Sequence, residues 1–489
     1  MNGMQPSLKF LTDDLVARIL DEAYQLLLDP GIKVQAPEAR SLLAEAGAQV
    51  DEGTEIVKIP ATIARRALEM APHQFSLYDR AGKPCVLYGG EAVHFDPGSS
   101  GVHVLDPVTL EHKPSYAADL VRLIKVAEQL PQYAAQSTAV VCNEIPKAIG
   151  DLYRLYLVLL FSSKPVVTGA FSVPTLQYMI DMLAVFSESR SGLAQKPTAI
   201  FDVCPSPPLI WSEFGAQNLI DLARAGVPAQ IVSMPLAGVA APVTLLGAVV
   251  QHAAECLSGI TIHQFAAPGA PIVWGGAPAI FDMRKGTTPM GAIETAMIDA
   301  SYAQVGKSLG LPTHAYLGAS DSKLVDAQAG LESGLSTLIG ALAGINMISG
   351  AGMLDFLACQ SAEKLVIDAE AIAMSQRLLE GMQVRTETLA TALFEGIQFK
   401  GDFLKQKATR QLFMQEQYLP SPVIDRDSVR GWQQAGSLDT FARARERVEA
   451  LLNSYQQPFI PPFLERELTE MVEHFARFAG MDRLPALPT

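Results

Sequence analysis

The sequence lacks the features that mark several large classes of protein. Its five cysteines are scattered, without the close spacing of a zinc motif or a disulfide framework, which predicts free thiols in a reducing compartment. No basic segment followed by an apolar run opens the chain, so we expect a cytoplasmic protein. The most apolar stretch, residues 230–278, is interrupted by prolines, glycines and His252, and we predict no transmembrane helix and no membrane partner.

Charge is also scarce. Only 18% of the 489 residues are charged, the net charge is −14 with a pI near 5.1, and lysine and arginine form no cluster. A nucleic-acid partner is therefore not expected, because phosphate binding needs a basic face. The hydrophobic content of 49% and the mean hydropathy of +0.20 predict a large core, with apolar surface left for a homo-oligomeric interface.

The common catalytic motifs are missing as well. There is no GxSxG nucleophile motif, no GxGxxG after a strand, no GxxxxGK[ST] phosphate loop and no zincin spacing. His94 and Asp96 could share a metal, but a strand-end histidine that forms hydrogen bonds is the favoured interpretation. We expect no metal to be bound by this chain itself.

The stretch Pro312 to Asp355 organises the rest of the chain. It reads as strand, loop, helix, strand and loop in about forty residues, the length of a βαβ unit. From Ala92 onward eight such strands alternate with helices, which predicts an α/β fold, a (β/α)8 TIM barrel. We predict an N-terminal α/β layer (1–90), the barrel (91–400), and a C-terminal arm with helices (401–489). Charges, prolines and aromatics alternate over 400–432, as in an arm lying over a surface.

Loops rich in glycine, proline and serine follow most of the predicted strands, as they would at one face of a barrel. Aromatic, methionine and acidic side chains lie at or just beyond the strand ends. A carboxylate within an aromatic cage binds a quaternary ammonium by cation–π attraction. The candidates are Phe95, Asp96, Phe171, Trp211, Trp274, Phe281, Tyr316, Asp321 and Met353.

Several long motifs resemble the trimethylamine methyltransferase superfamily, and they fall in the family's order over nearly the whole chain. They include WGGAPAIFDMRKGTTPMGAIETAM (274–297), GASDSKLVDAQAGLESGLSTLIGALAGINMISGAGMLD (318–355), HFDPGSSGVHVLD (94–106) and GDFLKQKATRQLF (401–413). The resemblance implies a barrel that moves a methyl group from an amine to the Co(I) of a corrinoid. That cob(I)alamin cofactor is carried by a separate small corrinoid protein.

This sequence departs from the family pattern at two places. The trimethylamine enzymes carry pyrrolysine in the barrel, and this chain has none. Where members often have a His-Thr pair, this chain has Ala408-Thr409. Members without pyrrolysine resemble demethylases of quaternary amines, chiefly of glycine betaine, with proline betaine, carnitine and other betaines as alternatives. A quaternary ammonium leaves as a neutral amine, so the protein need only position the N–CH3 bond and exclude water.

The resemblance turns the strand-end residues into a predicted substrate pocket, with no catalytic group beyond those that position substrate. We assign Phe95, Asp96, Phe171, Trp274, Tyr316 and Met353 to the ammonium and His103 or Arg284 to the substrate carboxylate, and we expect at most one acid beside the ammonium. The corrinoid-facing loops are predicted at Gly275, Gly276, Ser320, Asp321, Gly350 and Gly352.

Two other functions remain open from the sequence. One is a barrel enzyme that uses Asp202, Asp321 or His314 as a general acid or base. The other is a quaternary-amine-binding subunit without catalysis.

Overall fold

The computed structural model describes residues 5–187, 189–395, 397, 399, 401–481 and 483–487. Its centre is an eight-stranded parallel sheet in the order β6-β18-β17-β15-β13-β11-β10-β9. The backbone N–H of Ala134 donates to the carbonyl of Phe95 (2.9 Å), and Gly101 bridges Val140, so the two edge strands also meet. The strands are His94–Pro97 (β6), Gln136–Ser137 (β9), Val166–Gly169 (β10), Ala199–Val203 (β11), Ala229–Ser233 (β13), Ile272–Gly276 (β15), Thr313–Ala315 (β17) and Met347–Ala351 (β18).

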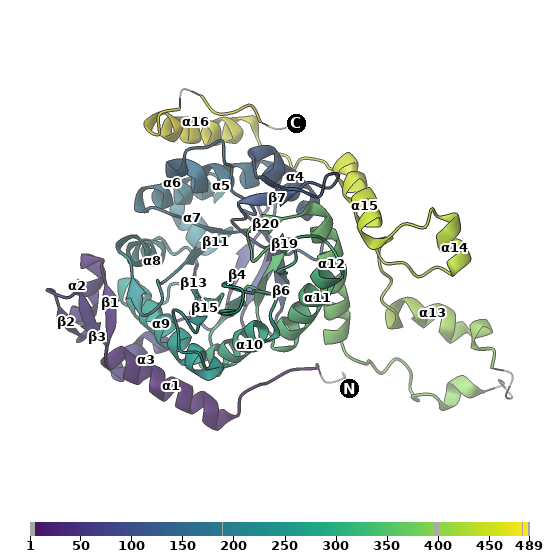
Figure 1. Ribbon diagram of the computed structural model, residues 1–489, viewed down its shortest axis with the longest axis horizontal. Coiled ribbons are helices and arrows are strands. Elements are labelled where there is room, and N and C mark those ends of the chain that lie inside the picture. Colours follow the sequence, from purple (N-terminus) through teal and green to yellow (C-terminus); the bar gives the residue numbers. More distant parts are fainter. Residues whose placement is uncertain are drawn as a thin grey trace.

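A ring of helices surrounds these strands (Figure 1). They are Ala117–Glu128 (α4), Gly150–Phe161 (α5), Val173–Ala184 (α6), Glu213–Ala225 (α8), Leu245–Ala266 (α9), Ile293–Ser308 (α10), Ala327–Leu342 (α11) and Ala362–Leu379 (α12). The predicted (β/α)8 barrel is therefore confirmed, with each strand followed by a helix. Strand β9 is the shortest of the barrel strands that the structure describes, and a six-residue helix, Arg190–Gln195 (α7), lies between α6 and β11.

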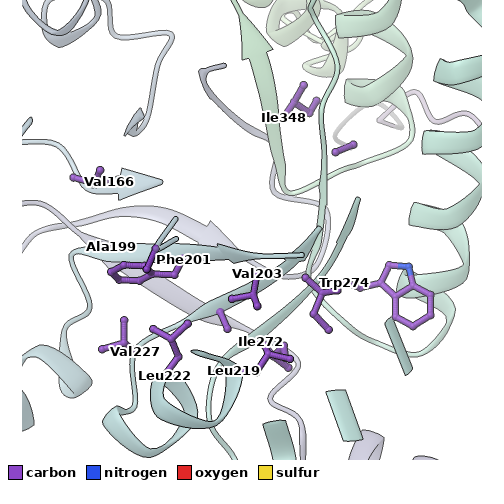
Figure 2. Close-up of a cluster of buried hydrophobic side chains, with 14 of the residues drawn as sticks. Val166, Ala199, Phe201, Val203, Leu219, Leu222, Val227, Ile272, Trp274 and Ile348 are labelled. Carbon is purple, nitrogen blue, oxygen red and sulfur yellow. The ribbon is translucent and has the colours of Figure 1, made fainter. Parts of the chain in front are cut away.

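Outward-facing strand side chains and inward-facing helix side chains form the main hydrophobic core. Figure 2 shows part of this layer, with Phe201, Val203 and Ile272 from the strands near Leu219 and Leu222 of α8. Small residues set the helix spacing at α11. A Cβ added to Gly340 would lie 2.9 Å from both Ile348 and Leu317, so a larger side chain there would push the helix off the sheet.

The amino-terminal end of the barrel interior is closed by a hairpin. Its strands are Phe75–Tyr78 (β4) and Pro84–Tyr88 (β5). Leu77, Val86 and Tyr88 pack with Val273 and Met347 of the barrel in a separate apolar cluster. The interior is therefore filled below, so a ligand of the barrel interior is expected at the carboxyl ends of the strands.

An N-terminal layer packs on the outside of α9. It contains Asp13–Leu28 (α1), Ile32–Val34 (β1), Pro37–Ala46 (α2), Gln49–Asp51 (β2), Ile56–Lys58 (β3) and Ala61–Met70 (α3). Strand β1 also pairs with Ile210–Trp211 (β12), which belongs to the loop after β11. Helix α9 is long and apolar enough to cross a membrane, but 78% of its apolar window is buried inside the protein. That burial makes α9 a core helix of the barrel.

Several short strands lie in the loops that follow the barrel strands. His103–Leu105 (β7), His112–Pro114 (β8), Met353–Leu354 (β19) and Cys359–Gln360 (β20) form one small sheet, and Leu236–Ala237 (β14) pairs with Ala279–Ile280 (β16). Short 3₁₀ turns cover Lys147–Ile149 (η1) and Val185–Ser187 (η2). All five cysteines are free in the structure.

After α12 the chain leaves the barrel as an arm (Figure 1). It contains Thr391–Phe394 (η3), Phe403–Lys405 (η4), Lys407–Glu416 (α13) and Val429–Gln434 (α14), and no residue of these four helices is buried. The predicted arm thus projects beside the barrel rather than lying on it. Thr440–Ser454 (α15) and Pro462–Phe478 (α16) then return to pack on α4, α12 and α5. The division into three domains stays a prediction.

Candidate active site

A layer of polar side chains crosses the barrel interior above the apolar cluster. It comes from five strands or strand ends and consists of Asp96, Asp202, Gln230, His314 and Ser349. Asp202 and Gln230 are neighbours in register on β11 and β13, and Asp96 and Ser349 are neighbours on β6 and β18. Since side chains alternate along a strand, the residues on either side of each face the outer core.

Asp202 is the centre of the first hydrogen-bonded group. One carboxylate oxygen accepts from the Gln230 amide (2.7 Å) and the other from the Tyr316 hydroxyl (3.0 Å). The Tyr316 oxygen in turn lies 2.8 Å from the Ser99 hydroxyl, in the loop after β6. Burial raises the pKa of Asp202 to about 7, although both hydrogen bonds oppose the shift. Asp202 nonetheless keeps partial solvent exposure.

Asp96 is the centre of the second group. The Ser349 hydroxyl donates to Asp96 Oδ1 (2.5 Å), and its oxygen lies 3.1 Å from His314 Nε2. Burial raises the pKa of Asp96 well above its usual value, with the nearby Asp202 charge adding to the effect. Burial lowers the pKa of His314 to about 3. His314 is therefore uncharged at neutral pH, the ionised form of Asp96 is disfavoured, and Asp202 is the acid of this layer that ionises near neutral pH.

Gly275 makes room for this arrangement. Its neighbour in register is His314, and a Cβ added to Gly275 would lie 2.9 Å from His314 Nδ1 and 2.7 Å from the Ile231 carbonyl. Any other residue would displace the imidazole. Neither His314 Nδ1 nor Asp96 Oδ2 has a hydrogen-bond partner within the described ranges of the chain.

Arg154 approaches the same end of the barrel from α5. Its side chain is 2% exposed, and Nη1 donates to the Ser100 hydroxyl (3.0 Å) and the Thr138 carbonyl (3.3 Å). The guanidinium carbon lies 5.4 Å from the centre of the Phe171 ring, which is 58% exposed at the barrel mouth. Ser100 directly follows Ser99, so the guanidinium and the Asp202 group are joined through one loop.

The structure brings four of the predicted substrate residues to this region. Asp96 and Tyr316 lie in the interior, and Phe171 stands at the mouth. Met353 packs closely on Gly98 in the loop after β6. A Cβ added to Gly98 would lie only 2.2 Å from the Met353 side chain. Fewer aromatic side chains therefore lie at the site than the sequence predicts, and its main charged group is a carboxylate.

The other four predicted substrate residues lie elsewhere. Phe95 and Trp274 face the outer core, as Figure 2 shows for Trp274, whose indole N–H donates to the Tyr302 carbonyl on α10 (3.0 Å). Strand alternation explains this, since each is adjacent to an inward-facing position. His103 lies in the small loop sheet. Arg284 is exposed and pairs with Asp282 (2.8 Å).

The six predicted corrinoid-facing residues are all buried within the scaffold of the mouth. Gly275 and Gly276 line strand β15. The Ser320 hydroxyl donates to Glu332 (2.6 Å), and Asp321 accepts the backbone N–H groups of Met290 (2.8 Å) and Gly291 (3.0 Å). Gly350 has a φ of 152°, and the Gly352 N–H donates to Asp368 (2.7 Å).

Exposed apolar side chains lie instead in three of the loops at the mouth. They come from the loops after β10, β13 and β15, and they are Phe171, Met234, Val239, Val243 and Met283. We call these five residues the apolar rim. Apolar groups gathered at the open end of a barrel mark an interaction surface.

The sequence reasoning missed Gln230, Ser349, Ser99 and Arg154. Gln230 and Ser349 occupy inward-facing positions of β13 and β18. The alternation of side chains along each strand therefore indicated that both residues face the barrel interior. Ser99 lies in the family motif at 94–106, where its sequence position alone indicates no role in the site. Arg154 had no local signal, because it lies in the middle of a helix whose residues are all buried except Gly150.

The fold and the site together define a barrel enzyme that acts on a small polar molecule at the carboxyl ends of its strands. The comparison with protein families narrows that class. The model of the trimethylamine methyltransferase (MTTB) family matches residues 1–478, and the chain belongs to this family. It is a methyltransferase.

Two kinds of relative are found among characterised proteins. Trimethylamine methyltransferase MttB of Methanosarcina thermophila is 34% identical over 93% of this chain and 95% of its own length. The glycine betaine methyltransferase of Desulfitobacterium hafniense is 27% identical over 98% of this chain and 100% of its own length. Among solved structures, the monomethylamine methyltransferase MtmB of Methanosarcina barkeri superposes with a TM-score of 0.52 at 12% identity, covering 93% of this chain and 90% of MtmB. This likeness shows the shared fold.

Proposed function

We propose that this protein transfers a methyl group from a quaternary amine, glycine betaine first, to a corrinoid held by a separate small protein. The observation that carries the proposal is the Asp202 carboxylate, hydrogen-bonded by Gln230 and Tyr316, in a site where burial disfavours the ionised form of Asp96 and keeps His314 neutral. One negative charge in the barrel interior suits one permanent cation. The relatives named for trimethylamine and glycine betaine support an N-methylated substrate.

The chain's own residues would bind and orient that substrate. Asp202 faces the ammonium, and the Gln230 and Tyr316 hydrogen bonds hold its carboxylate in one orientation. Burial disfavours the ionised form of Asp96, which therefore adds no second charge. A second negative charge beside the ammonium would be unfavourable for the reaction, because the nitrogen loses its positive charge as the methyl group leaves. A second carboxylate would therefore stabilise the ground state more than the transition state.

The corrinoid, when its carrier protein is docked, supplies the Co(I) nucleophile that accepts the methyl group. The residues present at the mouth fit such a partner. The apolar rim lies in loops at the mouth of the barrel and offers exposed Phe171, Met234 and Met283 to a docked protein or macrocycle. We propose that the corrinoid protein docks on this rim and excludes water from the site while the methyl group moves.

Two of the three candidates for the acid–base alternative are poorly suited to it, His314 by its pKa and Asp321 by its hydrogen bonds. His314 is neutral, with its pKa at about 3, and Asp321 is occupied by two backbone N–H groups of the neighbouring loop. Asp202 remains, since a pKa of about 7 would suit a general base. A base must however reach a proton on the substrate, and a quaternary ammonium carries none on nitrogen.

The test is methyl transfer to the purified corrinoid protein reduced to Co(I). Glycine betaine, proline betaine, carnitine and trimethylamine are compared, and the demethylated amine and the cobalt spectrum are followed together. Demethylation of a betaine is the expected result. Activity on none of the betaines would refute the proposal, and so would betaine binding by calorimetry without any product. Activity on trimethylamine alone would overturn the argument from the missing pyrrolysine.

We also propose that the protein is a cytoplasmic homo-oligomer. Support comes from the arm, which exposes large apolar side chains without forming a core of its own; they include Met382, Leu389, Phe394, Leu404, Met414 and Val429. A second copy of the chain that packed on the arm would bury them. Light scattering of the full chain measures the oligomeric state, and a monomer at micromolar concentration would contradict this proposal.

A further inference from the structure

Arg154 carries a positive charge at the barrel mouth and forms no ion pair within the described residues, although the charge of Asp151 acts on it from the same helix. Within the described residues no carboxylate lies within 4.0 Å of its nitrogens, and only Nη1 forms hydrogen bonds, both to uncharged oxygens. Asp151, on the same helix, is occupied by the Phe171 N–H (2.8 Å), the Leu152 N–H (2.8 Å) and the Thr175 hydroxyl (2.7 Å). A guanidinium that is 2% exposed and forms no direct ion pair is costly, because the more distant Asp151 charge compensates only part of its removal from water.

We propose that Arg154, with Ser100 and Phe171, forms a subsite for the carboxylate of the substrate, and that this subsite selects zwitterionic betaines over simple quaternary amines. The proposal rests on the proposed function and names its substrate class. A guanidinium presents paired N–H groups that match a carboxylate, and Arg154 has Nε and Nη2 free of hydrogen bonds within the described chain.

The position of Arg154 relative to Asp202 supports this assignment. Asp202 contacts Tyr316 at 3.0 Å, Tyr316 contacts Ser99 at 2.8 Å, and the next residue, Ser100, contacts Arg154 at 3.0 Å. The negative and positive groups therefore stand on two sides of one short loop, the arrangement that a small molecule with both charges requires.

Phe171 completes the subsite from the solvent side. Its ring lies over the guanidinium at 5.4 Å, while its backbone N–H is fixed by Asp151. The ring limits the access of water to Arg154 and so strengthens an ion pair formed beneath it. Arg284, the arginine expected from the sequence, lacks these properties, since it is solvent-exposed and already paired with Asp282.

The test compares Arg154→Met and Arg154→Lys with the natural protein on two ligands, glycine betaine and tetramethylammonium. Calorimetry on the isolated full-length chain gives Kd, and methyl transfer to the corrinoid protein gives KM and kcat. We expect Arg154→Met to weaken glycine betaine binding by about 10- to 100-fold, because a hydrogen-bonded charge is lost. Tetramethylammonium binding should change less than threefold, and Arg154→Lys should recover part of the betaine affinity. Circular dichroism and thermal melting check that each variant is folded.

Arg284→Met is the matched control, and it should leave both ligands unaffected. An equal loss for both ligands in Arg154→Met would show a purely structural role and overturn the proposal, as would an unchanged betaine affinity. A betaine-selective loss in Arg284→Met would also overturn it. If Arg154→Met does not fold, the same comparison is decided by Arg154→Lys. Absence of methyl transfer by the natural protein would refute the proposed function alone, since the calorimetric comparison needs no corrinoid.

Discussion

Replacing Asp202 by asparagine should stabilise the protein above neutral pH and abolish its affinity for the cation. In the folded state burial raises the pKa of Asp202 from 3.8 to about 7. A raised pKa means that the folded state favours the neutral carboxyl. The resulting stability is fully present below pH 4 and is lost as the pH rises through 7. The difference corresponds to about 4 kcal/mol at pH 8.5.

The asparagine variant avoids most of this loss. It keeps one oxygen in place of two, so one of the bonds from Gln230 and Tyr316 is sacrificed at a cost of about 1 kcal/mol. The net gain is therefore about 3 kcal/mol at pH 8.5 and disappears near pH 4. Urea unfolding followed by circular dichroism at pH 4.5, 7 and 8.5 measures it as a difference between the two proteins, in which all other titrating groups cancel.

Asp282→Asn is the control with the opposite sign. The Arg284 side chain holds the pKa of Asp282 at about 2, so its carboxylate favours the folded state above pH 4. The Asp282 variant should show no gain at high pH. If Asp202→Asn gives the same pH dependence as the natural protein, Asp202 is not a buried acid with a raised pKa, and the electrostatic argument for the site fails.

The same pKa predicts proton release on binding. At pH 6.5 a carboxyl with a pKa of about 7 is roughly three-quarters protonated. A quaternary ammonium requires the ionised form, so its binding should release about 0.7 proton. Calorimetry in two buffers with different heats of ionisation detects this release, and its absence would separate Asp202 from the ligand.

Three further predictions follow from the geometry. Ser349→Ala removes the hydrogen bond that Ser349 donates to the buried Asp96 carboxyl and should destabilise the protein by about 2 kcal/mol in urea unfolding; an unchanged midpoint would contradict it. Gly275→Ala places a Cβ 2.9 Å from His314 Nδ1, and should reduce methyl transfer at least tenfold while far-ultraviolet circular dichroism stays unchanged; full activity would show that the polar layer tolerates displacement. Met283→Asp, in the apolar rim, should raise the KM for the corrinoid protein about tenfold or more without altering betaine affinity; equal effects on both would place the docking surface elsewhere.

The barrel could be predicted from the sequence because its signals are local. Alternating apolar strands and helices, closed by glycine and proline, define each βα unit, and the stretch 312–355 shows one complete unit. The arm was harder to predict, since an amphipathic segment gives no indication of whether it packs on its own barrel or projects from it.

For the site, too, some features could be predicted from local sequence signals and others could not. The sequence by itself determined that acids, aromatics and histidine would gather at the carboxyl ends of the strands, because parallel strands end at one edge. Tertiary structure alone decided which of them face inward: Asp96, Asp202 and Tyr316 do, whereas Phe95 and Trp274 do not. A shift of one residue along a strand reverses the direction of a side chain, and strand ends predicted to within a few residues leave that direction open.

Only the tertiary structure determined which side chains of the site are charged. Whether a carboxyl is ionised depends on its depth and its hydrogen-bond partners, which come from distant parts of the chain: Ser349 for Asp96, and Tyr316 for Asp202. The same is true of Arg154, whose position in a buried helix carries no local signal and whose role arises from the loop that passes over it.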